Sequence, residues 1–470
     1  MGKIHAMMDM GKRAMMNSQT ALQTVSHNIA NKTTEGYSRQ RVEQVTAPPV
    51  SEGNLRLGTG SRAAQVSRIN NPFIDKQLQG ANREMGFLNA RSETMGRIEQ
   101  VFNEQQNKSL NQYVSDFFNS FRELSNNPES TTIRTIVKET AEALTKDFKR
   151  VDDQLETVRK DIDFQLDARV GEINRYTNEI AELNQKIASV EIQNVPANDE
   201  RDRRDLVLKK LNELIDVNVA DGDAGMINVS TAGNALLVTG FSQTELSAKV
   251  DPGSGQTEIY AVGQAGAHDI KITNRIKSGV TGGLLSVRDR VITEVKDRMD
   301  SLAFTLGNEV NKAHVLGYDR GGREGLAFFM TSDTKAGAAR SLRLNEAIAN
   351  DVSRIAAGAK DGSPGDNTVA NVISRIQYKQ VFDNGAATMD DYYNAQVGRI
   401  GVVAHQANKQ VETQGNVVKQ IEKLRESVAG VSLDEEATKM IEFQKSFDAS
   451  ARLIRVADEM FDTVLNLKRM

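Results

Sequence analysis

The sequence predicts an elongated, mainly α-helical protein of several domains, with an inserted β domain and with N- and C-terminal coiled-coil helices paired at one end. Three observations indicate this fold class. Apolar residues recur at alternating steps of three and four near both termini, which is the spacing of a coiled-coil seam. A similar stripe runs through residues 131–190, and the period changes to two between 215 and 273. A chain of 470 residues is also too long for one core.

The N-terminal segment is predicted to be a helix that needs a partner helix and then stops. Asn28 and Asn31 stand at its exit, where short amide side chains can bond backbone groups left free at a helix end. Gly36 follows, where glycine permits a turn with positive φ, and Tyr37 comes next. The seam positions are Ile4, Met8, Gly11, Met15, Ser18, Leu22, Val25 and Ile29.

The next part of the chain is predicted to be a helical rod. Residues 41–66 contain β-rich pieces that suit a linker or hairpin, and one helical region is expected over 71–124. The helix over 131–190 would be on the order of 80 Å long at ~1.5 Å per residue. This length suits an elongated rod rather than a compact domain. A shorter helix is expected at 198–215.

A small β domain is predicted between Ile215 and Thr273, because apolar residues alternate there and turn pairs such as Asp221-Gly222 separate the runs. Helix precedes and follows this insertion, so we expect it at the end of the molecule opposite the paired termini. Helix returns over 283–314, the segment 317–364 is loop-rich, and a last long stripe runs over 393–421.

The C-terminal segment is the second predicted seam helix. Ser432-Leu433-Asp434-Glu435 has the form of a capping box that starts a helix. We expect both seams to form the assembly contact, because an apolar stripe without a partner inside the monomer is exposed. The predicted assembly interface comprises Ile4, Met8, Met15, Leu22, Val25, Ile29, Asn28, Asn31, Gly36, Tyr37, Met440, Phe443, Phe447, Ile454, Phe461 and Val464.

These segments predict five units in chain order. The first and last are assembly helices, the second and fourth are two halves of a helical region, and the third is the β insertion. Their expected bounds are 1–42, 43–215, 216–282, 283–430 and 431–470.

Composition excludes several classes of function. The net charge of −4 gives no support to a nucleic-acid or polybasic membrane-surface role. The absence of cysteine excludes disulfides, thiolate zinc sites and thiol catalysis. No run approaches the roughly 20 apolar residues of a membrane-spanning helix.

The sequence predicts no enzyme, cofactor or metal site. The five histidines are scattered and show no ligand spacing. Gly58-x-Gly60 lacks the third glycine of a dinucleotide loop. The acids Asp199, Glu200, Asp202 and Asp205 alternate with arginines, so we interpret them as a solvated helix start rather than a metal site.

Both ends of the chain resemble the hook-associated proteins of the bacterial flagellum. At the N-terminus the resemblance rests on Ser26-x-Asn28-Ile29-Ala30-Asn31 and Gly36-Tyr37-Ser38-Arg39-Gln40. At the C-terminus it rests on Gly430-Val431-Ser432-Leu433-Asp434-Glu435-Glu436-Ala437 and on the segment from Phe461 to Leu467.

The resemblance implies a secreted structural subunit of the extracellular flagellum that self-associates into a junction ring between hook and filament. The implied partners are the hook protein, the second hook-filament junction protein and an export chaperone at the C-terminal helix. A rod or hook axial subunit is a rival within the same class, although Ser38-Arg39-Gln40 after Gly36-Tyr37 argues against it. A secreted coiled-coil effector and a chemoreceptor-like signalling module are rivals from different classes.

Overall fold

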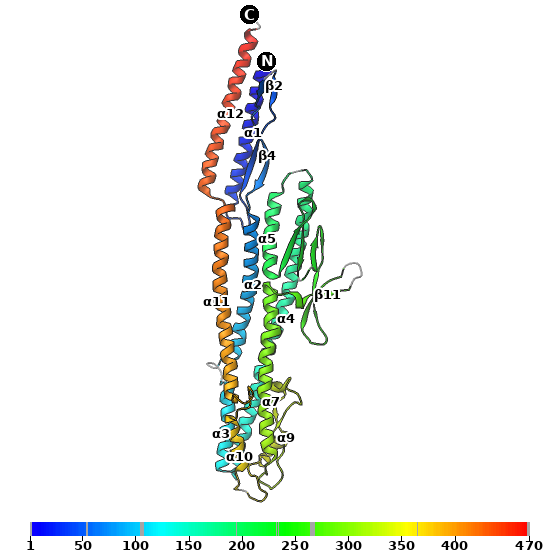
Figure 1. Ribbon diagram of the computed structural model, residues 1–470, viewed down its shortest axis with the longest axis vertical. Coiled ribbons are helices and arrows are strands. Elements are labelled where there is room, and N and C mark those ends of the chain that lie inside the picture. The colour runs from blue at the N-terminus through cyan, green and yellow to red at the C-terminus, as the bar shows by residue number, and fades with distance from the viewer. Residues whose placement is uncertain are drawn as a thin grey trace.

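The protein is a long rod whose two termini lie at the same end (Figure 1). The computed structural model describes residues 2–52, 55–103, 108–193, 195–231, 233, 235–263, 268–363 and 365–467. Long helices run along the rod, and a β-rich insertion stands beside its middle. The predicted fold class is confirmed, including the pairing of the terminal helices.

Helices make up most of the rod and run along its whole length. The long helices are α1 (Gly2–Ala30), α2 (Pro72–Val101), α3 (Leu110–Asn126), α4 (Thr131–Glu191), α5 (Asn198–Leu214), α7 (Thr293–Val315), α11 (Met389–Ala429) and α12 (Leu433–Leu467). The short ones are η1 (Asp223–Gly225), η3 (Thr273–Arg275), α6 (Gly279–Ser286), η4 (Val287–Ile292), α8 (Ala338–Ser341), α9 (Glu346–Asn350), η5 (Val352–Arg354), α10 (Thr368–Arg375) and η6 (Ile376–Tyr378).

Helix α4 is the axis of the hydrophobic core. Its predicted stripe is buried from Leu144 to Ile187 except at the half-buried Tyr176, and α3, α5, α7 and the β insertion pack around it. Ser130 starts the helix, because its side chain accepts a hydrogen bond from the Ile133 amide. The predicted helix over 131–190 is therefore confirmed to within one residue.

The strands form small antiparallel sheets. The insertion contains a four-stranded sheet in the order β5-β6-β7-β8 and a three-stranded sheet in the order β11-β10-β9. A two-stranded ribbon continues from β1 and β4 into β2 and β3. The strands are β1 (Gln40–Thr46), β2 (Val50–Glu52), β3 (Leu55–Leu57), β4 (Ser61–Arg68), β5 (Val217–Asp221), β6 (Ile227–Thr231), β7 (Ala235–Thr239), β8 (Ser242–Gln243), β9 (Leu246–Val250), β10 (Thr257–Ala261), β11 (Ile270–Lys271), β12 (Phe329–Met330) and β13 (Arg343–Leu344).

Two asparagines of α4, the buried Asn184 and the half-buried Asn174, attach the insertion to the rod. The Asn184 amide donates hydrogen bonds to the carbonyls of Ile227 and Gly240, both at 2.8 Å. Its oxygen accepts from the Ile227 amide, and Asn174 bonds both backbone groups of Leu246 in the same way. A side chain that satisfies two neighbouring strands fixes their position on the helix.

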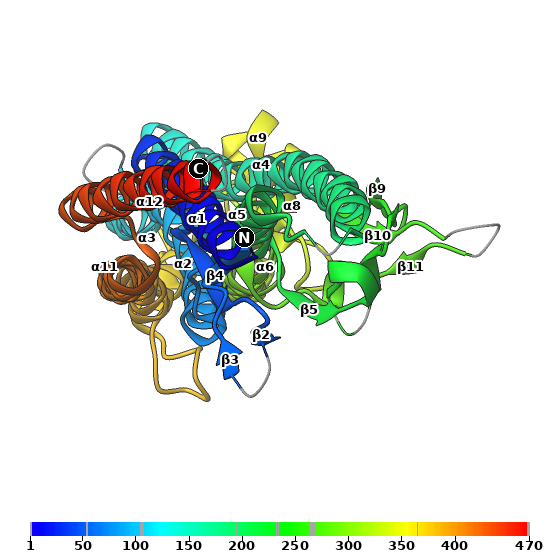
Figure 2. The same cartoon turned by 90° about the horizontal axis from the view of Figure 1, so that it is seen from above.

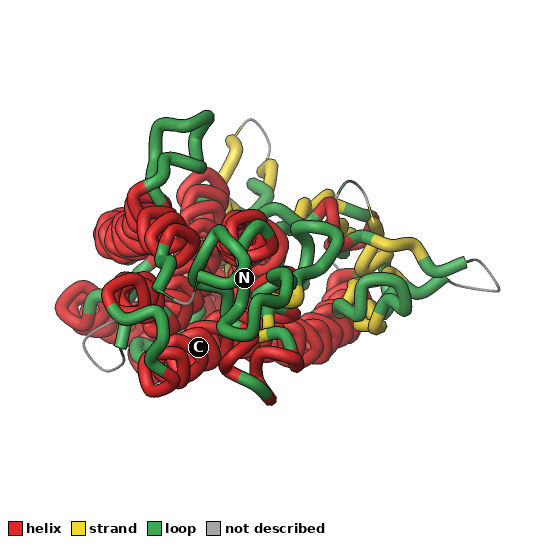
Figure 3. The backbone as a smooth tube through the Cα atoms, turned by 90° about the horizontal axis from the view of Figure 1, so that it is seen from below, coloured by secondary structure: helices red, strands yellow, loops and turns green. Residues whose placement is uncertain are grey.

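One expectation about the layout is wrong. The insertion lies beside the middle of the rod, while the loop-rich segment and short helices form the end opposite the termini (Figures 1 and 3). The insertion is held there because α4 continues well beyond its contact with the sheets. The expected helical region over 71–124 is two helices, since α2 ends at Val101 and α3 begins at Leu110 behind the cap of Ser109.

The terminal helices α1 and α12 form an antiparallel pair. The rings of His5 and Phe461 lie 5.4 Å apart, and the Ser18 hydroxyl donates to the Ser446 hydroxyl at 3.1 Å. The two contacts pair the start of α1 with the end of α12 and the middle of α1 with the first half of α12, so the two helices run in opposite directions. A Cβ atom on Gly11 would lie 2.6 Å from Cγ1 of Ile454, so glycine permits the close approach of the two helices at this point.

Candidate functional site

The candidate site is the point where the α1/α12 pair joins the rest of the molecule, which is called the rod from here on. The turn after α1, the start of the ribbon, the start of α12 and helix α5 meet there (Figures 1 and 2). We call the group Asn28, Tyr37, Arg39, Gln40 and Glu436 the elbow clamp. It joins the N-terminal motif to the C-terminal motif.

Asn28 is the centre of the elbow clamp. Its amide nitrogen donates to the Gln40 carbonyl and to Oε2 of Glu436, both at 2.9 Å. Its oxygen accepts from the Tyr37 hydroxyl at 2.7 Å and from the Gln40 amide at 2.9 Å. Asn28 is only 1% exposed. All four hydrogen-bonding positions of this amide are used, so a residue of another shape would leave buried partners unsatisfied.

Arg39 joins the same cluster to both glutamates at the start of α12. Its guanidinium contacts Glu436 through Nε and Nη2, both at 2.7 Å, and Glu435 through Nη1 at 2.7 Å. The Glu436 side chain is 1% exposed and that of Glu435 is 61% exposed. The Arg39 amide also donates to the carbonyl of Ala429, the last residue of α11. The break between α11 and α12 is therefore fixed by the N-terminal motif.

Helix α5 supplies the third side of the junction. Asp202 accepts from the Ser38 amide at 2.9 Å and from Arg68 at 2.8 Å, and Arg68 also bonds Asp205 at 2.8 Å. Asp199 accepts from the Gln40 side chain at 2.8 Å. The interpretation of these acids as a solvated helix start is wrong for Asp202, which is buried against the N-terminal motif.

Gly36 has the left-handed backbone expected of it. Its φ is +85°, and a Cβ atom there would lie 3.0 Å from the Cβ of Leu206 on α5. Both the turn and the close packing on α5 require glycine. Asn31 bonds its own helix end, since its side-chain nitrogen donates to the His27 carbonyl at 3.1 Å.

The electrostatics of the elbow clamp follow from burial among carboxylates. Burial raises the pKa of the Tyr37 hydroxyl, and the nearby charges of Asp199, Asp202 and Glu436 raise it further. Burial also raises the pKa of Asp202, although hydrogen bonds from Ser38 and Arg68 oppose the rise. Burial would lower the pKa of Arg39, but its bonds to Glu435 and Glu436 outweigh burial and raise it. Tyr37 is therefore a neutral donor at neutral pH.

The predicted seam residues face one another inside the chain. Val25 is buried, and the side chains of Leu22, Phe443, Phe447 and Ile454 are half-buried, in the contact between α1 and α12. Ile4, Met8, Met15, Ile29, Met440 and Phe461 are also half-buried, while Val464 is 37% exposed. Their role in contacts between subunits stays a prediction.

Sequence reasoning misses several residues of the site. Arg39, Glu436 and Asp202 hold the junction together, yet none of them is among the predicted site residues. Glu435 is expected only as part of a helix cap, whereas the structure places one of its oxygens on Arg39. The signal that could have found them is the excess of acids at the starts of α5 and α12, which pair with Arg68 and Arg39 respectively.

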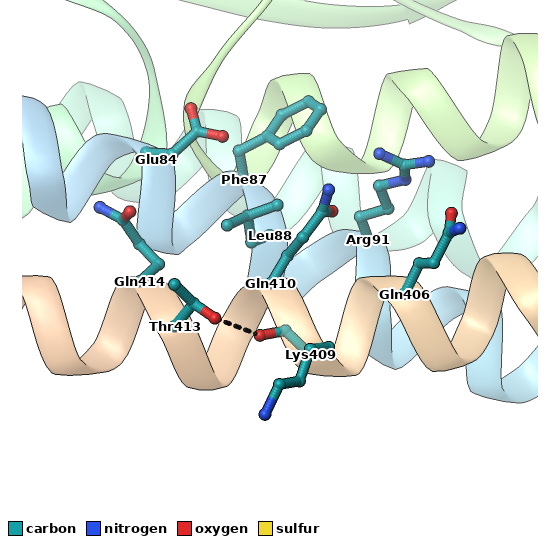
Figure 4. Close-up of a pocket in the computed structure, with 9 residues that line it drawn as sticks. All are labelled: Glu84, Phe87, Leu88, Arg91, Gln406, Lys409, Gln410, Thr413 and Gln414. Carbon is teal, nitrogen blue, oxygen red and sulfur yellow. Dashed lines mark hydrogen bonds between the residues drawn. The ribbon is translucent and has the colours of Figure 1, made fainter.

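A groove between α2 and α11 is a second candidate site (Figure 4). The only polar contact drawn there is local, because the Thr413 hydroxyl donates to the Lys409 carbonyl of the same helix at 2.9 Å. The lining of the groove consists of Glu84, Phe87, Leu88, Arg91, Gln406, Lys409, Gln410, Thr413 and Gln414.

Neither a metal centre nor a membrane-spanning helix is found in the described part of the chain. Within it, no three histidine, aspartate or glutamate side chains converge in a way that could hold a metal ion. Among the same residues, no helix combines the length and apolar character needed to cross a membrane.

Comparison with known proteins identifies the family. Residues 95–329 match the family model described as the flagellar hook-associated protein FlgK helical domain. Residues 410–467 match the C-terminal model of the flagellar basal body rod FlgEFG proteins. The first match covers half of the chain, and the second covers α12 and the end of α11.

Relatives of known name cover nearly the whole chain. Flagellar hook-associated protein 1 of Bacillus subtilis is 27% identical over 98% of this chain and 97% of its own length. The protein of the same name from Escherichia coli is 26% identical over 96% of this chain and 97% of its own. The solved flagellar hook junction protein FlgK from Burkholderia pseudomallei covers 75% of this chain and 100% of its own, with a TM-score of 0.67 and 17% identity. The chain therefore belongs to the family of the flagellar hook-associated protein FlgK.

Proposed function

We propose that the protein is a structural subunit that self-associates into the junction ring between hook and filament. This proposal rests on one observation: the α1/α12 pair extends beyond the rod, and the elbow clamp bonds it to the rod. A helix pair that projects from its own hydrophobic core can be covered by copies of the same chain. Family membership supports the same role, because its members carry the name hook-associated.

The same reasoning gives the partners. A ring at the end of the hook contacts the hook protein on one side and the second hook-filament junction protein on the other. Before export, the apolar side chains of α12 need cover, which an export chaperone at the C-terminal helix would supply. The protein then acts outside the cell, in the flagellum, and works through contacts rather than through catalysis.

A rod or hook subunit is the second candidate, because the C-terminal segment matches the model of the rod proteins. One experiment separates the two roles. The gene is deleted in the source bacterium, and the cells are examined by electron microscopy. A junction subunit predicts complete hooks without filaments and filament protein free in the medium. Loss of the hooks themselves would identify a rod or hook subunit, and normal filaments would refute both roles. Restoration by the intact gene is the control.

A further inference from the structure

A second apolar row on α12 lies outside the seam. Val456 is 51% exposed and Met460 is 47% exposed, and the exposed Ala449 lies two helical turns before Val456. Their steps of seven and four place them along one side of the helix. This row, which we call the outer stripe, is distinct from the seam through Phe447, because the seam faces α1.

A second exposed apolar surface lies on the ribbon. Val50 is paired across the strands with Leu57, and both side chains are exposed, as is that of Val45. Helix α1 packs on β1 and β4 of this two-stranded ribbon, whereas Val50 and Leu57 stand on its outer strands β2 and β3. We call Val45, Val50 and Leu57 the ribbon face.

The outer stripe and the ribbon face belong to different elements of the terminal unit, α12 and the ribbon. Helix α1 lies between α12 and the ribbon both in the side view and from above (Figures 1 and 2). A contact between two different surfaces of the same chain is head to tail, and a head-to-tail contact closes into a ring when the rotation permits.

The charges of the two sides are complementary. Carboxylates outnumber cationic side chains along α12, whereas arginines outnumber glutamates in residues 40–68. Among the described residues, no ion pair reaches Arg56 or Arg62 of the ribbon. A contact between two α12 helices would bring like charges together, so the ribbon side of another copy is the better partner for α12.

We infer that the outer stripe of α12 binds the ribbon face of a second copy of this chain, so that neighbouring subunits join head to tail. This inference rests on the proposed ring and names the surfaces that build it. The seam through Phe443, Phe447 and Phe461 then holds each subunit together, while the outer stripe joins it to the next.

Engineered cysteines test this contact directly, because the chain has no cysteine of its own. The variant Val456→Cys/Val50→Cys is expressed in the source bacterium in place of the natural chain, and hook-filament structures are isolated and oxidised. A second pair, Met460→Cys/Leu57→Cys, repeats the test at another position. The single variants are controls, and so is Val456→Cys/Phe164→Cys, because Phe164 is 77% exposed on α4 of the rod.

We expect both test pairs to give cross-linked ladders longer than a dimer, and the single and control variants to give none. Dimers from Val456→Cys alone would show α12 against α12 and would overturn the inference. Protein present in the isolated structures but not cross-linked by either test pair would overturn it as well, while leaving the ring intact. Absence of the natural chain from hook-filament structures would instead refute the proposed function.

Discussion

Helix α4 and helix α12 carry apolar stripes of the same spacing, but the two stripes are covered to different extents. Phe148, Leu155 and Leu166 of α4 are completely buried, since helices and sheets surround them. Phe447 and Ile454 of α12 are only half-buried, since α1 is the one helix packed along them among the described residues. The comparison teaches that the rod holds its own core, whereas the terminal pair leaves apolar side chains half-exposed, as the proposed assembly requires.

The largest expected effect is a difference in unfolding free energy between variants in the stripe of α4 and variants in the stripe of α12. Replacing Phe148 by alanine leaves a cavity in the rod and should cost about 3–5 kcal/mol of unfolding free energy. Phe447→Ala is the matched change in α12, and it should lower the stability of the rod by less than about 1 kcal/mol because the terminal pair is outside that core. Denaturant unfolding of the two purified variants measures the difference. Equal losses would mean that α12 belongs to the core of the monomer.

The second effect concerns the far end of the rod, where His314 is buried. Its Nδ1–H donates to the Leu326 carbonyl, and its Nε2 accepts from the Ala356 amide at 2.8 Å. Burial, together with the positive charges of Arg134 and Arg354, lowers the pKa of His314 to about 4. The imidazole must therefore stay neutral in the folded protein, because a second proton would point at the Ala356 amide.

The pH dependence follows from that shift. The unfolded chain binds the proton near pH 6.5 and the folded chain only near pH 4, so stability is complete above pH 6.5 and is lost as pH falls through this window. The loss is about 3 kcal/mol by linkage. We expect His314→Gln to flatten this slope and His405→Gln, at an exposed position, to leave it unchanged. If the unfolding free energy of His314→Gln changed with pH as steeply as that of the natural chain, the assignment of this pH dependence to His314 would be wrong.

The third effect tests the elbow clamp. Asn28→Ala leaves the Tyr37 hydroxyl, the Gln40 amide and Glu436 without their partner, which should cost about 1–3 kcal/mol in the docking of the terminal pair. Limited proteolysis should then cut faster between α1 and the ribbon, while the rod stays resistant. Glu435→Gln is the matched control, because its exposed ion pair contributes about 0–1 kcal/mol. Equal cleavage of both variants would show that the clamp does not hold the pair.

The smallest effect is expected at Gly11. Gly11→Ala places a methyl group too close to Ile454, and overpacking of this kind costs typically about 1–3 kcal/mol. Alanine regains about 1 kcal/mol because its helix propensity is higher than that of glycine. The free energy that holds α1 against α12 should therefore fall by about 1 kcal/mol. Proteolysis of α12 measures it, and adding Ile454→Ala should remove the effect. Slower cleavage in Gly11→Ala alone would mean that the helices lie farther apart than described.

The sequence predicted the parts of the molecule that depend on local pattern. The stripe of α4, the separate start of α12 and the turn at Gly36 all follow from residue spacing or backbone preference. The partners of the elbow clamp did not follow, since Asn28 and Glu436 are brought together only by the tertiary fold. The position of the insertion was also mispredicted, because Asn174 and Asn184 attach it to the middle of the rod and no local pattern reveals such contacts.

The most direct test of the contrast between rod and terminal pair is amide hydrogen exchange of the purified protein and of the same protein in isolated hook-filament structures. We expect α4 to be protected from exchange in both states. Helices α1 and α12 should exchange rapidly in the free protein and become protected in the assembled one, because other subunits then cover the outer stripe. Equal protection of α12 and α4 in the free protein would contradict the claim that the terminal pair is completed by assembly.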